Sequence, residues 1–284
     1  MKIEPIVIFN GGLCLENDPV VSMQSRGLMY GDGCFETLRT YDSYFLKWEE
    51  RIERLSEGME YLKLAVPFSS PYLKEAIQRL LRMNGKARDD AMVRIQCWRD
   101  GARGYYSASK KANWSVSVQA IPESSDQLSL HTSSVRAIPS VSLSRAVKLS
   151  NALNYVLAAK EANEHHYDDA LMLTINGNVS EATSANMFWI KGNTVFTPSV
   201  ECDLLPGIIR SMVIDVVRES GFSIQEGKFL LTDLLEADFA FATNSVKEIL
   251  RVSSVDHRRF PERNAVYTFI KRAFENAKQE ALAA

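Results

Sequence analysis

The stretch Ile121-Pro122-Glu123-Ser124-Ser125-Asp126 divides the sequence into two regions of different pattern. It is polar, contains a proline and interrupts the hydrophobic periodicity on either side of it. We therefore predict a smaller domain of residues 1–120, a linker of residues 121–126 and a larger domain of residues 127–284, which would carry the chemistry.

The region before this break is expected to form strands and two helices. Residues 6–9 are an apolar run that stops at Asn10-Gly11, a dipeptide typical of hairpin turns. Apolar residues three and four apart in residues 48–62 predict an amphipathic helix, and alternation in residues 114–120 predicts a strand with one buried face. Further elements are expected at residues 34–46 (a hairpin turning at Asp42-Ser43), 73–81 (a helix) and 92–98 (a strand).

Beyond the break, predicted strands alternate with helices. The helices are expected at residues 151–165, 208–220 and 266–274, and the strands at residues 128–137, 169–175, 185–197 and 238–243. This mixture favours a fold of two α/β or α+β domains, and a groove between such domains is the usual place for a ligand.

Composition and charge exclude several classes of function. The 284 residues are 46% hydrophobic and carry a formal net charge of −2, so no extended basic surface is expected and nucleic acid is not a predicted partner. No apolar run approaches the roughly 18 residues of a membrane span, and the first residues lack the pattern of a signal peptide. We expect a cytoplasmic protein whose four scattered cysteines are reduced. His165-His166 is expected at an exposed helix end, and no spacing indicates a metal site.

Lys148 is a candidate nucleophile. It lies in the stretch Arg145–Asn151, immediately before a predicted helix. A lysine at such a position is most simply a solvated side chain. When the amine is buried, however, its pKa falls and the neutral form can attack a carbonyl group.

Two further stretches suggest what Lys148 would act on. In Leu204–Arg210 a Pro-Gly turn leads directly into a helix, and the free N–H groups at a helix start can hold a phosphate. Glu181 stands alone among small polar residues before the apolar run Met187–Ile190. Buried there, its carboxylate would need a positive partner such as a protonated pyridine nitrogen, and the alternative is an exposed glutamate on a hairpin tip. Lysine, carboxylate and phosphate cradle together are the anchors that pyridoxal 5′-phosphate requires.

The order of the motifs resembles that of the class IV aminotransferases, the fold-type IV pyridoxal-phosphate enzymes. The resemblance covers nearly the whole chain. It rests on Arg26–Arg39 (RGLMYGDGCFETLR), Arg51–Leu55, Lys148 with Asn151, Asn178–Phe188, Thr197-Pro198, Leu205–Arg210, Ala237-Asp238 and Thr243-Asn244-Ser245. It implies a two-domain α/β fold like that of D-amino-acid aminotransferase, and a homodimer with active sites near the interface.

The resemblance also implies roles for individual residues. Lys148 matches the lysine that forms the Schiff base and moves the proton, and Glu181 matches the partner of the pyridine nitrogen. The remaining cofactor contacts would be Arg54 (phosphate), Leu205 (under the ring), Gly207, Ile208 and Ile209 (phosphate cup), and Asn244 and Ser245. The sequence departs from the family at Ile209, where a threonine is common, and at Ala152, where many members carry a tyrosine.

Within the family, the sequence is most like 4-amino-4-deoxychorismate lyase, which forms 4-aminobenzoate and pyruvate in folate biosynthesis. Gly101–Tyr105 is similar to the Gly-Gly-Arg-Gly-Tyr stretch of that branch, so Arg103, Tyr105 and Phe35 are expected substrate contacts and the substrate is expected to carry a carboxylate. After Ile249 the glycine-rich segment usual in the transaminases is absent from the sequence. A branched-chain or D-amino-acid aminotransferase is the alternative, and a non-catalytic protein that binds the cofactor or an amine is a second one.

Overall fold

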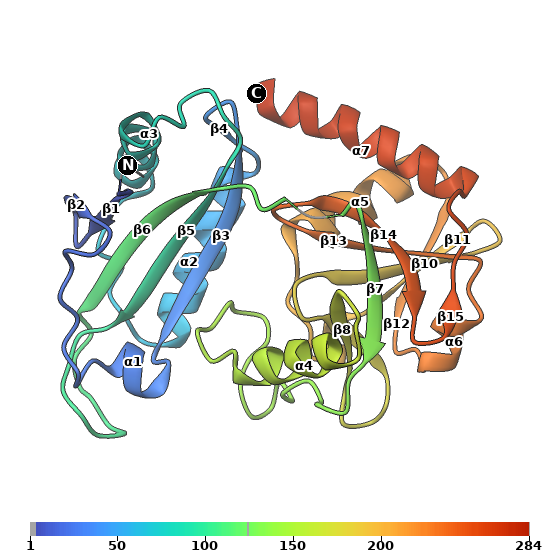
Figure 1. The fold of residues 1–284 in the computed structure, drawn as a ribbon, viewed down its shortest axis with the longest axis horizontal. Helices are drawn as coiled ribbons and strands as arrows, with labels where there is room; N and C mark the ends of the chain where they lie inside the picture. Colours follow the sequence, from blue (N-terminus) through green and yellow to red (C-terminus); the bar gives the residue numbers. More distant parts are fainter. Residues whose placement is uncertain (1–3, 124, 284) are drawn as a thin grey trace. The chain divides into compact units, whose positions relative to one another are not determined.

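The computed structural model describes residues 4–123 and 125–283, so Ser124 of the predicted linker lies outside the described residues. The chain forms two compact units (Figure 1). The first unit contains the residues up to Pro122 together with Val147–Asn151, and the second contains Glu123–Ala146 and the residues from Ala152 onward. The chain thus leaves the first unit within the stretch predicted as a linker, but a short segment later returns to it.

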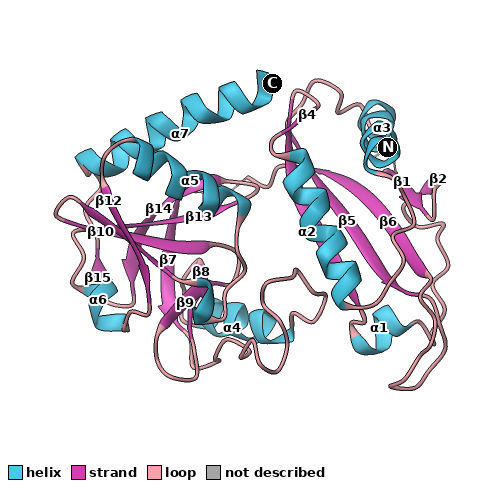
Figure 2. Ribbon diagram, turned by 180° about the vertical axis from the view of Figure 1, so that it is seen from behind, coloured by secondary structure: helices cyan, strands magenta, loops and turns pink. Residues whose placement is uncertain are grey.

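The first unit is built on a six-stranded sheet in the order β2-β1-β6-β5-β3-β4, with antiparallel neighbours. The strands are β1 (Ile6–Phe9), β2 (Gly12–Leu15), β3 (Gly33–Tyr41), β4 (Tyr44–Phe45), β5 (Ala91–Arg99) and β6 (Ala112–Ala120). Helix α1 (Arg26–Tyr30) is short, whereas α2 (Trp48–Tyr61) lies along the sheet against β3, as Figure 2 shows. Helix α3 (Ser70–Met83) contacts β1 and β6.

Alternation along the strands decides which side chains reach the core of the first unit. Leu38 on β3 and Ile95 on β5 face the buried side, where α2 contributes the apolar stripe of Ile52, Leu55 and Met59. Because side chains alternate along a strand, the residues between these buried positions lie on the other, partly exposed face. The helices and strands predicted before the break are confirmed.

The second unit contains a nine-stranded sheet in the order β12-β11-β10-β13-β14-β7-β8-β9, with β15 paired to β14. The strands are β7 (Gln127–Thr132), β8 (Asp169–Leu173), β9 (Val179–Ala182), β10 (Asn186–Lys191), β11 (Thr194–Pro198), β12 (Ser223–Gly227), β13 (Phe239–Asn244), β14 (Glu248–Val255) and β15 (Arg258–Arg259). Strand β9 also pairs with β10, at Glu181 and Asn186, so six strands form a closed ring. Such a ring leaves no open edge at this point.

Helices cover this sheet from outside. They are α4 (Leu153–Glu164), α5 (Ile208–Glu219), α6 (Leu231–Leu235) and α7 (Ala265–Ala283), with a 3₁₀ turn at Val200–Cys202. Helix α4 packs on β8 through Ala158 and Ala162, while α5 packs on β13 and α7 (Figure 1). The interior of the ring is filled by apolar side chains such as Trp189 and Leu171.

Two strands predicted for the second unit differ from those in the structure. The single strand expected at residues 185–197 is a hairpin, because Gly192 adopts a positive φ of 59° and turns the chain between β10 and β11. The strand expected at residues 128–137 ends at Thr132. His165 and His166 are exposed at the end of α4, as predicted.

In residues 4–123 and 125–283, no helix is long and apolar enough to cross a membrane. Over the same residues, no cluster of three or more histidine, cysteine or acidic side chains is arranged to hold a metal ion. All four cysteines are free thiols.

Candidate active site

Lys148 belongs to the first unit, although it was predicted in the C-terminal domain. The reason is backbone pairing: the Phe35 N–H donates to the Lys148 carbonyl at 2.9 Å, and Leu149 forms a β-bridge with Cys34. Residues 148–150 thus pair alongside the start of β3. The Lys148 Nζ atom lies 4.9 Å from the centre of the Phe35 ring, so two of the predicted site residues lie together.

Arg94 is part of this arrangement and was not predicted. Its guanidinium carbon lies 3.8 Å from the centre of the Phe35 ring, and its N–H groups donate to Gln96 Oε1 at 2.9 and 3.2 Å. Gln96 in turn donates to the Ser150 hydroxyl at 2.7 Å. Alternation along β5 could have placed Arg94 and Gln96 on one face, but the register with β3 that brings them to Phe35 is not visible in the sequence.

Arg54, expected to bind a phosphate, is paired with a carboxylate that sequence reasoning missed. Its guanidinium donates to both oxygens of Glu36, at distances of 2.7 to 2.9 Å. Glu36 is fully buried, and Arg51 lies 3.8 Å from the same carboxylate. One carboxylate and two guanidinium groups have a formal charge of +1 together, which leaves the group suited to an additional anion.

Glu181 is buried in the second unit, which excludes the alternative of an exposed glutamate on a hairpin tip. It lies on β9 and is 6% exposed. Its Oε1 accepts a hydrogen bond from the Tyr155 hydroxyl at 2.6 Å, and its Oε2 accepts from Asn186 Nδ2 at 3.0 Å and from the Leu205 N–H at 3.2 Å. These three donors fix the orientation of the carboxylate.

The turn before α5 is fixed by the same asparagine. Asn186 Nδ2 also donates to the Leu205 carbonyl at 2.8 Å. A Cβ atom at Gly207 would lie 2.1 Å from Asn186 Oδ1, so only glycine allows this close approach. Gly207 is the N-cap of α5, and no side chain caps the helix start there. The first-turn N–H groups of α5 therefore suit an anion.

The other predicted phosphate contacts differ in what they offer. The Ile209 side chain is 1% exposed and packs in the core, so only its backbone N–H could meet a phosphate. Asn244 ends β13, and its Oδ1 accepts from the Val246 and Lys247 N–H groups at 3.0 and 2.8 Å. The Asn244 side chain therefore shapes the turn that carries Ser245.

Arg103 and Tyr105, the predicted substrate contacts, lie on an exposed loop between β5 and β6. Tyr105 is 94% exposed. The buried Arg26 donates to the carbonyls of Ala102, Gly104 and Tyr105, and the Gly104 N–H donates to the Tyr30 hydroxyl at 3.0 Å. These bonds hold the loop backbone and leave the side chains of Arg103 and Tyr105 directed outward.

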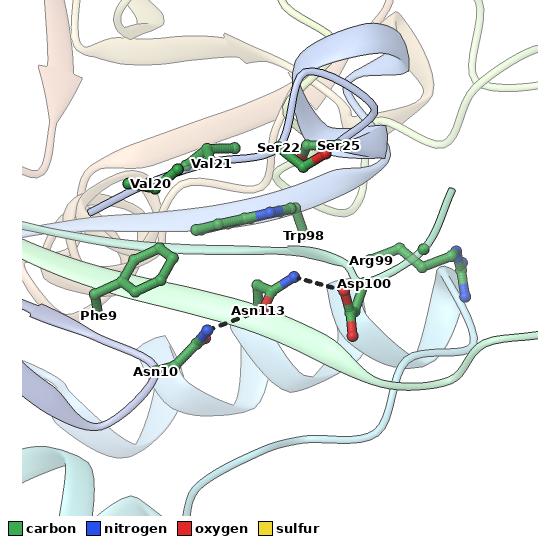
Figure 3. Close-up of a pocket in the computed structure, with 11 residues that line it drawn as sticks. Phe9, Asn10, Val20, Val21, Ser22, Ser25, Trp98, Arg99, Asp100 and Asn113 are labelled. Carbon is green, nitrogen blue, oxygen red and sulfur yellow. Dashed lines mark hydrogen bonds between the residues drawn. The ribbon is translucent and has the colours of Figure 1, made fainter. Parts of the chain in front are cut away.

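A cavity of about 270 Å³ in the first unit lies apart from these residues. Its lining includes Phe9, Trp98 and Asn113 (Figure 3). Asn113 is bonded to Asn10 at 2.9 Å and to Asp100 at 3.2 Å, so these three polar side chains of the lining pair with one another. None of the predicted site residues lines this cavity.

Comparison with known proteins gives consistent matches. The family model described as amino-transferase class IV matches residues 33–255. A Methanocaldococcus jannaschii protein, assigned by inference as a branched-chain-amino-acid aminotransferase, is 34% identical over 256 residues, which cover 89% of this chain and 88% of that protein. The aminodeoxychorismate lyase of Vibrio harveyi is 30% identical over 244 residues, covering 83% and 87%. The structure of the Escherichia coli branched-chain amino acid aminotransferase is similar with a TM-score of 0.90, at 26% identity over 97% of this chain and 95% of that chain.

Proposed function

The chain belongs to the class IV aminotransferase family, and from this membership we propose that it is a pyridoxal-phosphate enzyme acting on a carboxylate-bearing amine. The observation that carries the proposal is the environment of Glu181, a buried carboxylate with three hydrogen-bond donors. Two solved branched-chain amino acid aminotransferases of similar fold, each 24% identical, are complexes with pyridoxamine 5′-phosphate and with N-(5′-phosphopyridoxyl)-L-glutamate. The fold expected from the resemblance is confirmed.

The residues present fit the cofactor. When bound, pyridoxal phosphate draws electrons from the substrate carbon through its protonated ring. We assign covalent attachment and proton transfer to Lys148, and the ring nitrogen to Glu181. Arg54, with its cluster charge of +1, and the N–H groups of Ile208 and Ile209 would hold the phosphate.

Within the family we propose aminodeoxychorismate lyase activity, which releases pyruvate and 4-aminobenzoate. This substrate carries two carboxylates, to which we assign the exposed guanidinium groups of Arg94 and Arg103 in the first unit. A branched-chain aminotransferase is the second candidate, because the Methanocaldococcus jannaschii relative is 34% identical. The polar groups of Arg94 and Gln96 beside Phe35 suit an acidic substrate better than an aliphatic side chain.

The two candidates are separated by one assay. We expect the holoenzyme to form 4-aminobenzoate from aminodeoxychorismate without any amino acceptor, and Arg103→Ala to raise KM on the order of 10-fold, since a bond to a charged group is lost. Arg82→Ala, on the exposed side of α3, is the control. Amino transfer from leucine or D-alanine to 2-oxoglutarate without release of 4-aminobenzoate would contradict the lyase proposal and favour the transaminase.

We further propose that the protein is a homodimer. Exposed apolar side chains gather along residues 20–29 of the first unit, where Val20 is 89% and Met23 is 80% exposed, together with Leu28. Several large apolar side chains exposed close together in the sequence are a reason to expect a protein interface there. Sedimentation is expected to give twice the 31.9 kDa chain mass, and Met23→Glu with Leu28→Glu is expected to lower it. A monomer at micromolar concentration would overturn this proposal.

A further inference from the structure

A tyrosine outside the sequence motifs contacts the Glu181 carboxylate. Tyr155 lies on α4, and its hydroxyl donates to Glu181 Oε1 at 2.6 Å. Ala158 and Ala162, three and seven residues later, are fully buried against β8, so the same helix face carries all three side chains. The packing of α4 on the sheet therefore fixes the position of the Tyr155 hydroxyl.

A buried arginine contacts the other side of this hydroxyl. Arg145 Nη2 donates to the Tyr155 hydroxyl oxygen, and its guanidinium carbon lies 4.9 Å from the centre of the Tyr155 ring. Arg145 is 6% exposed, and its Nη2 lies 3.9 Å from Glu181 Oε1. Arginine, hydroxyl and carboxylate form a chain in which each donor strengthens the next.

The chain has a fixed direction of donation. Because Arg145 has no acceptor, the Tyr155 oxygen must accept from it and the Tyr155 proton must point to Glu181. Burial, and next the neighbouring charge of Glu181, raise the pKa of Tyr155 far above its usual value, so the hydroxyl keeps its proton. Asn186 and the Leu205 N–H hold the second carboxylate oxygen from the opposite side.

We propose that Tyr155, supported by Arg145, is a positioning residue that holds the Glu181 carboxylate for the ring nitrogen of the cofactor. The inference rests on the proposed function. It assigns Tyr155 no contact with substrate or cofactor, because the hydroxyl acts through Glu181. The loss of this hydroxyl would then affect only ligands whose ring nitrogen Glu181 can meet.

The test compares two ligands on the cofactor-free full-length chain. One is pyridoxamine 5′-phosphate, and the other is its analogue with carbon in place of the ring nitrogen. Tyr155→Phe is expected to weaken binding of pyridoxamine phosphate on the order of 10-fold, since a hydrogen bond to a charged group is lost, and to leave the affinity for the carbon analogue unchanged. Glu181→Gln should show the same selectivity. Tyr267→Phe, which removes the hydroxyl of a tyrosine on α7 that packs against Phe239, is the matched control.

Each result decides a different question. If Tyr155→Phe weakens the binding of both ligands equally, or of neither ligand, the positioning role of Tyr155 is overturned and the proposed function still stands. A wild-type chain that binds neither ligand would overturn both. If Tyr155→Phe does not fold, Arg145→Lys keeps the charge but alters its bond to the hydroxyl. Arg145→Lys should weaken the binding of pyridoxamine phosphate less than is expected for Tyr155→Phe, and should leave the affinity for the carbon analogue unchanged. Equal weakening of both ligands would again overturn the positioning role of Tyr155.

Discussion

Replacing Lys148 with alanine is expected to lower kcat at least about 10³-fold, because a side chain that moves a proton and forms a covalent bond contributes that much or more. The chain should still fold, since the pairing of residues 148–150 with β3 runs through backbone atoms. The decisive measurement is mass spectrometry after borohydride reduction. The wild-type chain should retain the cofactor on the peptide that contains Lys148, and the alanine variant should not.

The control for this experiment is Lys160→Ala, in an exposed lysine of α4 whose nearest acidic partner, Glu164, is one helical turn away. The Lys160→Ala variant should retain the cofactor on the Lys148 peptide after borohydride reduction, as the wild type does. Trapping at another lysine would remove Lys148 from the reaction. If the wild-type chain gains no visible absorbance with pyridoxal phosphate and is not trapped at all, the non-catalytic alternative would be favoured.

Glu36→Gln is expected to lower the free energy of unfolding by about 3–5 kcal/mol, the usual cost of leaving a buried charge without its partner. Glu36 is fully buried between Arg54 and Arg51, and the amide would neutralise the one carboxylate among these three groups. Burial lowers the pKa of Arg51, because loss of solvent disfavours its charged form. The effect should appear in urea unfolding of the cofactor-free chain.

Tryptophan fluorescence reports mainly on the unit that contains this cluster, because Trp48, Trp98 and Trp114 lie in the first unit and only Trp189 lies in the second. Glu50→Gln, which removes an exposed pair with Lys47, should change stability by less than about 1 kcal/mol. The double variant Glu36→Gln with Arg54→Met should recover part of the loss. An unchanged unfolding midpoint for Glu36→Gln would show that the ion pair is not a determinant of stability.

The sequence was informative where a pattern is local. The period of the apolar residues predicted α2, and alternation predicted β6, because each is a property of one segment. The hairpin of β10 and β11 was missed although Gly192-Asn193, which connects the two strands, is a dipeptide typical of hairpin turns. The five residues of α1 are too few to show a period.

The residues of the candidate site also differ in whether a local sequence pattern reveals them. Lys148 and Glu181 could be proposed from the sequence because their motifs follow one another in a recognisable order. Glu36, Arg94 and Tyr155 were missed, because their roles depend on partners distant in sequence. The pairing of Glu36 with Arg54 joins a strand to a helix 18 residues later, and that of Tyr155 with Glu181 spans 26 residues. Only tertiary packing establishes such neighbours.

The sheet closes into a ring where Glu181 on β9 pairs with Asn186 on β10, so the same residue closes the ring and belongs to the candidate site. A substitution of Glu181 would also remove its side-chain hydrogen bond to Asn186, at the pairing that closes the ring of strands. We therefore expect few other residues to be tolerated at this position. The loop that carries Arg103 and Tyr105 is held through its backbone, and its side chains can change without disturbing the fold. We therefore expect close relatives that differ in substrate preference to differ in the residues of that loop. Glu181 and Asn186 are expected to stay the same in them.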